Sequence, residues 1–375
     1  MCYEYILMLE DYFAKIATKE DYTPSQIGYS LALFQDTFPN LDNVEVAIFG
    51  LRKPNGLSSN CNTVRSAFYR LANTRLEVKV ADLGDIKQGE SVKDTSESIV
   101  EVCCILQSKN IIPVFIGDHM DQAENLYKAF QQNKIAAEVS LISDKLPMLD
   151  LELLNRICTS PPNFLTNISA IGFQAQYLPK KALDTLENLN FNHLRLGELK
   201  QNIENAEVCL RNAGITIFDI NAIQHSDAPG KKTTQPSGLS SEEACQLARY
   251  AGLGDENRAF AITGYNYTLD HRDLTATLCA HIIWYYLDGY SNRTNDSPGR
   301  HNEFIKYRCD FNNEEDPILF IKSKRTQRWW MQIEHPSTPE DQTKKLSFPC
   351  TYADYQMAAN GETPQRYLDA LKKLA

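Results

Sequence analysis

The sequence has no apolar run long enough to cross a membrane and no segment typical of a secretory signal. Its apolar stretches fall well short of the roughly 18 residues that a membrane-spanning helix needs. The first residues, MCYEYILMLEDYF, include Glu4 and Glu10 but no basic region, whereas a secretory signal begins with positive charge. We therefore expect neither membrane insertion nor secretion.

An excess of basic residues is also missing. The chain has 38 Lys and Arg against 48 Asp and Glu, which gives a formal net charge of −10. Nonspecific binding to nucleic acid depends on a basic surface. We therefore expect no nucleic-acid partner.

Paired cysteines are the third absence. The ten cysteines are scattered without a CxxC pair, and their spacing does not match a zinc site. Cys103 and Cys104 are adjacent inside an apolar pattern of helical period. We expect most thiols to be small buried hydrophobes in a reducing compartment, which indicates a cytoplasmic protein.

What the sequence does contain is a series of short apolar runs rich in β-branched residues. The run at residues 111–117 is followed at once by Asp118 and His119. Such runs are typical of strands buried on both faces of a parallel sheet, and ligands bind at the carboxyl ends of those strands. The turn after this run is therefore a candidate site. The alternative is that His119 is an ordinary loop residue and Asp118 caps the next helix.

Six further runs of this kind indicate an α/β domain. Helical patterns separate most of them, and alternating strands and helices predict a mainly parallel sheet with helices on both faces. The runs cover residues 44–51, 77–81, 139–143, 168–173, 215–220 and 259–263.

The pattern divides the chain into three parts. Residues 1–43 are expected to be an N-terminal helical segment, with one helix over 25–34. Residues 44–290 are the expected α/β domain. A polar, turn-rich stretch begins near Asp288 and leads into a strand-rich C-terminal extension, residues 291–375, that ends in an amphipathic helix.

Five motifs stand in order along the chain. They are ADLGDI (81–86), GDH (117–119), FDIN (218–221), APG with PSGLSSEEA (228–244) and GYNYTLDHRDLTATLCA (264–280). Together they resemble the ureohydrolase family of arginase, agmatinase and formiminoglutamase, and in the last motif Asn266, Asp270, Thr275 and Ala276 stand at matching places. The resemblance covers roughly residues 44–290.

The resemblance implies a three-layer α/β/α sandwich on a mainly parallel, eight-stranded sheet. Family members hydrolyse a guanidine or amidine carbon with two Mn²⁺ ions that share a bridging hydroxide. These hard cations need carboxylate and imidazole ligands. The family supplies them from a Gly-Asp-His turn, an Asp-Ala-His-x-Asp segment and an Asp-x-Asp segment.

Three positions of this chain keep a ligand type. His119 matches the ligand of the Gly-Asp-His turn, and Asp144 and Asp219 match the first residues of the other two segments. In the family, the positions of Asp144 and Asp219 bridge the two ions. His119, Asp144 and Asp219 are therefore the candidate metal ligands, and we expect them to hold at most one divalent ion, such as Mn²⁺.

The other positions depart from the family pattern. Leu146 and Met148 stand where the second segment should have His and Asp, and a one-residue shift of the alignment to begin at Ser143 restores neither. Asn221 replaces the second carboxylate of the Asp-x-Asp segment. Gly264 stands where the family has the acidic residue that holds the substrate's guanidinium group.

Too few anionic groups remain for a pair of metal ions. Two dications about 3.5 Å apart repel strongly unless several carboxylates offset their charge, so we expect no dinuclear site. The alternative to a single ion is a dry remnant, in which the three candidate ligands hydrogen-bond to one another and to nearby backbone. Tyr265 and Tyr267, which replace smaller family residues, are then expected to fill the vacated volume.

Three functions are compatible with this pattern. The first is a ureohydrolase-fold pseudoenzyme that lacks the binuclear manganese hydrolase activity and acts by binding a partner or ligand. The second is a mononuclear-metal hydrolase of linear amidines or amides. The third is a structural subunit that docks into a larger assembly through residues 291–375.

Trp329 and Trp330 are the candidate partner-binding residues. Tryptophan is enriched at interaction hot spots, and we expect a protein partner or a homo-oligomer. Neighbouring residues of a strand point to opposite faces. The alternative is therefore that one of the two lies in the core and the other is half-exposed.

Overall fold

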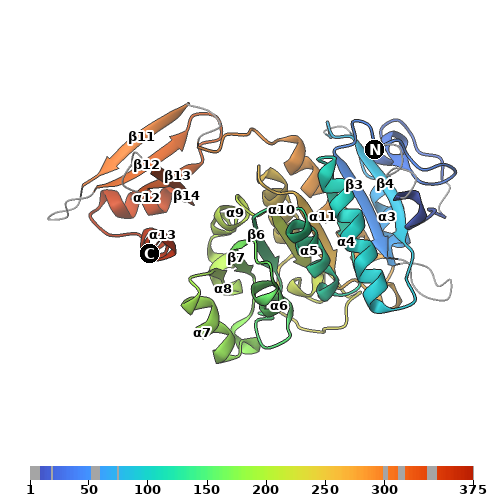
Figure 1. Ribbon diagram of the computed structural model, residues 1–375, viewed down its shortest axis with the longest axis horizontal. Coiled ribbons are helices and arrows are strands. Elements are labelled where there is room, and N and C mark those ends of the chain that lie inside the picture. Colours follow the sequence, from blue (N-terminus) through green and yellow to red (C-terminus); the bar gives the residue numbers. More distant parts are fainter. Residues whose placement is uncertain are drawn as a thin grey trace.

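In the described part of residues 9–298, ten strands form one large sheet (Figure 1). The computed structural model describes residues 9–17, 20–51, 60–73, 76–298, 303–310, 317–335 and 344–374. The strands of this sheet are β1 (Phe13–Ala14), β2 (Ala32–Leu33), β3 (Val46–Leu51), β4 (Val80–Ile86), β5 (Ile112–Ile116), β6 (Ala137–Ile142), β7 (Leu165–Ile171), β8 (Asn192–Leu194), β9 (Ile215–Asp219) and β10 (Ala259–Thr263).

The strand order confirms the predicted sheet. It is β1-β4-β3-β5-β10-β9-β6-β7-β8, with β2 also paired to β4. The eight strands from β4 to β8 in this order all run parallel to their neighbours. Only β1 is antiparallel, and it pairs with β4 at the border of the sheet. As a result β5, β10, β9 and β6 are consecutive, and their carboxyl ends meet in the middle of one edge.

Helices cover both faces and complete the three-layer sandwich. Ile48 of β3 faces the layer of α3, α8, α9, α10 and α11, and the next residue, Phe49, faces the layer of α4 to α7. The helices are α2 (Ile27–Ser30), α3 (Asn60–Tyr69), α4 (Val92–Ser108), α5 (Glu124–Gln132), α6 (Leu153–Thr159), α7 (Lys180–Asn188), α8 (Leu196–Gln201), α9 (Glu204–Leu210), α10 (Ser241–Leu253), α11 (Leu274–Ser291), α12 (Tyr352–Ala359) and α13 (Gln365–Leu374), with 3₁₀ turns η2 (Met120–Ala123), η3 (Ala175–Tyr177), η4 (Ile220–Ala222) and η5 (Tyr267–Leu269).

The central strands are buried along their whole length. Every residue of β3, β5, β9 and β10 is buried, which explains why the sequence shows continuous apolar runs instead of alternation. Among the described helices, none combines the length and the apolar character needed to cross a bilayer.

The helical prediction for the N-terminal segment is wrong in its second part. Residues 25–34 contain only the short α2, followed by β2. The backbone N–H of Phe34 donates to Asp82 O at 3.0 Å, and the N–H of Ile16 donates to Phe34 O at 2.8 Å. The segment thus supplies backbone hydrogen-bond partners for the outer edge of β4. This pairing outweighs the local helical pattern of residues 25–34. Residues 1–8 of this prediction lie outside the described residues.

The C-terminal part is a separate four-stranded antiparallel sheet (Figure 1). Its strands pair in chain order: β11 (Phe304–Cys309), β12 (Ile318–Ser323), β13 (Trp329–His335) and β14 (Lys344–Cys350). The structure thus confirms that the extension is strand-rich and ends in a helix, α13, whereas α12 was not predicted. Pro349 weakens the strand signal of β14, but β14 is an edge strand, where proline is tolerated.

The prediction of an exposed tryptophan anchor is wrong for both residues. Trp329 is 6% and Trp330 2% exposed. Trp329 packs within the apolar cluster beneath α12, while the guanidinium of Arg211 in the α/β domain lies 4.8 Å from the ring centre of Trp330. Both side chains are covered because this small sheet is packed on each of its faces.

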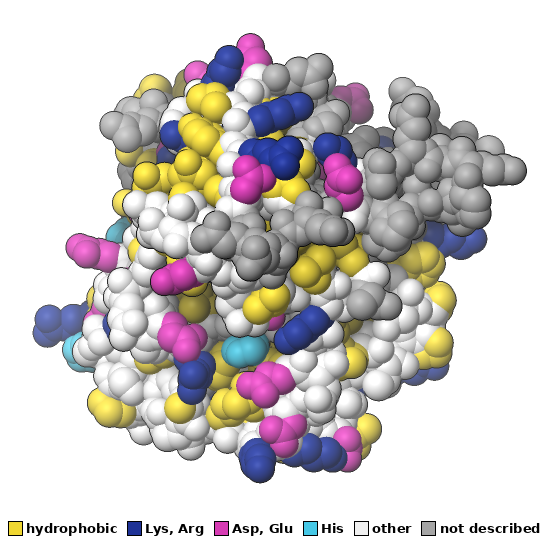
Figure 2. Space-filling model, turned by 90° about the vertical axis from the view of Figure 1, so that its left-hand side faces the viewer, with side chains coloured by type: hydrophobic (Ala, Val, Ile, Leu, Met, Phe, Trp, Pro, Cys, Tyr) yellow, Lys and Arg dark blue, Asp and Glu magenta, His cyan; other side chains and the backbone are white. Residues whose placement is uncertain are grey.

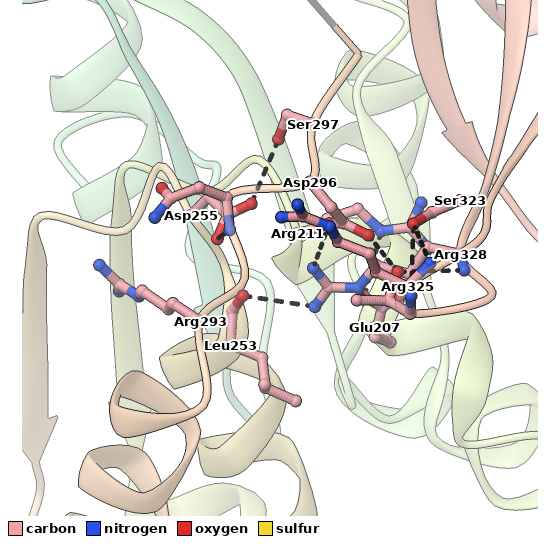
Figure 3. A network of polar contacts seen from close by, with 12 residues as sticks. Glu207, Arg211, Leu253, Asp255, Arg293, Asp296, Ser297, Ser323, Arg325 and Arg328 are labelled. Atoms are coloured by element: carbon pink, nitrogen blue, oxygen red, sulfur yellow. Dashed lines mark hydrogen bonds and ion pairs between the residues drawn. The ribbon is translucent and has the colours of Figure 1, made fainter. Parts of the chain in front are cut away.

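The chain that connects the large sheet to the C-terminal sheet is held in place by hydrogen bonds and an ion pair. Helix α11 continues past Asp288, whose carboxylate pairs with Arg249 at 2.7 Å, so the turn-rich stretch starts later than predicted. Arg293 then donates to the backbone carbonyl of Asn257 at 3.0 Å, and Ser297 Oγ donates to Asp255 at 3.4 Å (Figure 3).

A buried ionic network joins the C-terminal sheet to α9 (Figure 3). Glu207 of α9 pairs with Arg211 at 2.5 Å and with Arg328 at 3.0 Å. Arg328 also lies 3.5 Å from Asp296, and Arg211 donates to the carbonyl of Trp329 at 2.7 Å. Burial alone would raise the pKa of Glu207, but the two guanidinium groups outweigh it and lower that pKa. Glu207 is therefore the carboxylate on which the junction depends.

We predict that Glu207→Gln lowers the free energy of unfolding at pH 7 by about 3 kcal/mol, because it leaves two buried guanidinium groups poorly compensated. The folded-state pKa is depressed, so the stabilisation by Glu207 is complete above its unfolded pKa near 4.5 and is lost as the pH falls through the folded value. Urea unfolding at about pH 7 and pH 3 should show the difference shrinking at the lower pH.

Glu198→Gln is the matched control. Glu198 pairs with Arg195 at 3.1 Å, but both side chains are about half exposed, so we expect a loss under about 0.5 kcal/mol. Equal losses for the two variants would contradict the role given to Glu207.

Candidate functional site

A cavity of about 370 Å³ opens at the carboxyl ends of β5, β6, β9 and β10. These are the four strands that the topology makes consecutive, and the turns after them form the walls. The residues from the predicted motifs that line it are Asp118, His119, Ser143, Asp144, Asp219, Asn221, Gly264, Tyr265 and Asn266, joined by Met120, Asp121, Lys145, Lys232 and Thr233.

The structure brings two of the three candidate ligands together. Asp144 and Asp219 are 2% and 4% exposed. The hydroxyl of Ser143 lies 3.4 Å from Asp144 Oδ1 and 3.5 Å from Asp219 Oδ2, so the two carboxyl groups share one donor. The two carboxyl groups therefore lie close together, with the Ser143 hydroxyl between them.

Side-chain amides bind the remaining carboxylate oxygens. Gln235 Nε2 donates to Asp144 Oδ2 at 2.7 Å. Asn221 Nδ2 and its backbone N–H donate to Asp219 Oδ1 at 2.8 and 3.1 Å. Thr233 Oγ1 in turn donates to Asn221 Oδ1 at 2.6 Å, which orients the amide nitrogen toward Asp219. Each of the four carboxylate oxygens thus has a protein donor within reach.

Lys231 supplies a positive charge next to these groups. Its side chain is 2% exposed, and its Nζ donates to the backbone carbonyls of Asn221 and Ile223. Burial lowers the pKa of Lys231 to about 8, and the nearby carboxylates of Asp144 and Asp219 oppose that shift. The amine is therefore mostly protonated at neutral pH.

Burial raises the pKa values of both carboxyl groups. Burial, together with the Asp144 carboxylate, raises the pKa of Asp219 to about 7 against the hydrogen bonds from Asn221. Burial also raises the pKa of Asp144, while Gln235 and the neighbouring lysines oppose the rise. At neutral pH, Asp219 is therefore a mixture of the neutral acid and the anion.

His119 stands apart from the two carboxyl groups. It is exposed at the mouth of the cavity, just before η2. Its backbone N–H donates to Gln122 Oε1 at 3.3 Å, and the N–H of Asp118 donates to the same oxygen at 2.9 Å. The structure records no hydrogen bond between the His119 ring and Asp144 or Asp219. A remnant in which all three residues bond to one another is thus not what the chain forms.

These side chains do not fit a manganese centre. In the part of the chain that the structure describes, no three His, Cys, Asp or Glu side chains converge as a metal site would require. A dication needs several free anionic oxygens, but Asp144 and Asp219 accept hydrogen bonds from Gln235 and Asn221. A buried ammonium also stands nearby, which would repel a metal ion.

Gly264 is required by the conformation of its turn. Its φ is +88°, and a Cβ atom there would lie 2.5 Å from Asp219 Oδ1. No acidic side chain can occupy this position while Asp219 keeps its place. The next residue, Tyr265, is 1% exposed and lines the cavity, where its hydroxyl donates to Asp270 at 3.2 Å.

Lys231 and Gln235 are the site residues that sequence reasoning missed. They lie in the loop between the APG and PSGLSSEEA segments, which matches the family only at its two ends. The sequence did offer one signal. This loop lies close in sequence to the segment that matches Asp-x-Asp, and it holds Lys231 and Gln235 between Gly230 and Pro236.

We predict that Gly264→Ala destabilises the protein more than Gly361→Ala does. Both glycines have positive φ, +88° and +84°, but a Cβ at Gly361 would meet nothing within 4 Å. Left-handed strain of roughly 1–3 kcal/mol is common to both, and only Gly264→Ala adds the contact with Asp219. Chemical denaturation of the two variants measures the difference. Equal losses would show that Asp219 moves aside freely.

Comparison with known proteins agrees with this fold. Residues 160–288 match the model of the arginase family. No curated protein matches the chain at a significant level.

Solved structures of the same architecture cover most of the chain. Formimidoylglutamase from Bacillus subtilis has 16% identity and a TM-score of 0.63, over 77% of this chain and 99% of that one. Formiminoglutamase from Trypanosoma cruzi with Mn²⁺ has 15% identity and a TM-score of 0.61, over 68% and 96%. Arginase from Bacillus caldovelox has 15% identity and a TM-score of 0.53, over 65% and 98%.

At these identities the likeness to solved structures establishes the fold, and the family model adds a match in sequence across β7 to α11. The chain therefore has the fold of these solved structures, and its residues 160–288 resemble the arginase family in sequence.

Proposed function

We propose that this protein keeps the ureohydrolase fold without the binuclear manganese hydrolase activity and acts through binding, as a pseudoenzyme. The observation that carries the proposal is the hydrogen bonding of Asp144 and Asp219. Their oxygens accept from Gln235, Asn221 and Ser143. The protein's own donors thus take the places that metal ions would need.

Lys231 supports the same conclusion through charge. Two buried carboxyl groups need a compensating cation or a proton. Here the Lys231 ammonium supplies the cation, and the raised pKa of Asp219 supplies the proton. Charge balance is therefore reached by the chain alone.

The cavity still has the form of a binding site. A hollow of about 370 Å³, lined by apolar surface and a few polar and charged groups, is large enough for a small molecule. Asp118, His119, Lys145 and Lys232 at its mouth offer charges of both signs. The nine described cysteines are all free thiols, which supports a cytoplasmic location.

The decisive experiment is metal analysis of full-length protein purified with added Mn²⁺, combined with activity assays. We expect much less than one equivalent of manganese per chain. We also expect no urea release from arginine or agmatine and no glutamate release from formiminoglutamate. Two equivalents with turnover would overturn the proposal. One equivalent with turnover would favour a mononuclear hydrolase that uses His119, Asp144 and Asp219.

A substitution at Lys231 tests the charge argument. We predict that Lys231→Met leaves Asp144 and Asp219 uncompensated and lowers the free energy of unfolding at pH 7 by about 2–4 kcal/mol. Mn²⁺ should then raise the melting temperature of this variant more than that of the wild type. Thermal unfolding with and without Mn²⁺ measures both effects.

Lys232→Met is the control, because Lys232 lines the same cavity but is exposed. It should leave both the melting temperature and the response to Mn²⁺ close to those of the wild type. If Lys231→Met behaves in the same way as this control, Lys231 does not balance the charge of the site.

A further inference from the structure

A second cavity lies at the seam between the two parts of the chain, away from the carboxyl edge of the large sheet. It has a volume of about 670 Å³ and is bounded by α9 and α10 on one side and by the C-terminal sheet and α12 on the other. We call it the seam groove. Figure 2 views the molecule from the side of the C-terminal part, where hydrophobic side chains lie among charges of both signs.

One wall of the seam groove is aromatic. Trp329 stacks on Tyr355 with ring centres 4.8 Å apart, and Tyr307 lies 5.0 Å from each of these rings. Tyr352 of α12 lies 5.5 Å from Trp329 and is 53% exposed. The rings come from two strands and a helix, so packing of the C-terminal sheet against α12 holds them in place.

The opposite wall carries two carboxylates. Glu207 is neutralised by its ion pairs with Arg211 and Arg328. Glu204, one turn earlier on α9, is exposed and forms no ion pair with any described residue. Tyr250 of α10 lines the same wall; burial, with the Glu204 carboxylate, raises its pKa. The groove therefore places the Glu204 carboxylate across from a wall of stacked aromatic rings, of which Tyr352 is exposed.

The chain already pairs cations with these tryptophans. The guanidinium of Arg211 lies 4.8 Å from the centre of Trp330 while its other side binds Glu207. The ammonium of Lys322, directly across the strand pair from Trp329, lies 5.4 Å from that ring centre. Both contacts are within the range in which an aromatic face attracts a positive charge.

We propose that the seam groove binds an organic cation, an alkylammonium or guanidinium group, between the Glu204 carboxylate and the rings of Tyr352 and Trp329. Such a cation gains from the negative faces of the rings, from Glu204 and from the net charge of −10 on the chain. The site is separate from the cavity proposed above as a remnant of metal chemistry and does not depend on that proposal.

Lys322 is an internal competitor for this site. Its ammonium occupies part of the space over Trp329, so a ligand must approach a positive charge or displace it. Removing that charge should strengthen binding of a cation and weaken binding of an anion. This opposite response separates the proposed ligand class from its alternative.

Calorimetric titration of the full-length protein with argininamide and with tetramethylammonium tests the proposal. We expect saturable binding of both, weakened about three- to tenfold by Tyr352→Ala and by Glu204→Gln. Lys322→Met should tighten binding by a similar factor. Tyr29→Ala, which removes a 63% exposed tyrosine on α2, is the matched control and should change nothing.

A further titration, with an arginine-containing peptide, identifies the source of the cation. Tighter binding of the peptide acetyl-Gly-Arg-Gly-amide than of argininamide would support the proposal with a protein as the source, and equal binding would support it with a free small molecule. The absence of saturable binding, or unchanged affinity in both Tyr352→Ala and Glu204→Gln, would overturn it. Tighter binding of benzoate than of either cation, with loss on Lys322→Met, would show an anion site and would also overturn it.

Discussion

The burial of two carboxyl groups at the carboxyl edge of the sheet is the constraint on which the functional part of this molecule depends. Asp144 lies just after the end of β6, and Asp219 is the last residue of β9. The topology places these two strands side by side. Buried carboxylates are costly unless hydrogen bonds, a cation or a proton compensate them. This chain uses all three: Gln235 and Asn221 donate hydrogen bonds, Lys231 supplies the charge, and burial raises the pKa of Asp219 to about 7.

The need to accommodate these two buried carboxyl groups also explains the shape of the site. Gly264 has no side chain, so the Asp219 carboxyl group can lie against its backbone. Tyr265 fills volume beside it and is itself tied to Asp270, whose carboxylate accepts the first N–H groups of α11. Gly264 and Tyr265, two of the departures from the ureohydrolase pattern, thus each have a local structural partner. The residues at this edge form a consistent arrangement and not a damaged one.

The sequence predicted the parallel sheet because its strands are continuous apolar runs, and it predicted Asp144 and Asp219 through their match to the ureohydrolase motifs. It could not predict the contacts that cross the chain. Residues 25–34 have a helical pattern, yet they pair with the border of β4 because that border needs hydrogen-bond partners. The sequence suggested that Trp329 and Trp330 bind a partner. Their burial depends on how both faces of the small sheet pack against other parts of the chain, which a local sequence pattern does not show. Lys231 carries no local signal, since its role depends on carboxylates supplied by distant strands.

The conformation at Gly264 has a consequence for how this protein can change over time. A metal centre with a substrate anchor would require an acidic residue in a left-handed turn, next to a carboxyl group that already fills the space. It would also require the loss of Lys231 and a carboxylate in place of Asn221. Each of these replacements, made alone, would disturb the charges and hydrogen bonds that compensate Asp144 and Asp219. Any route from this arrangement to a binuclear metal centre therefore passes through less stable intermediates, which tends to preserve the arrangement.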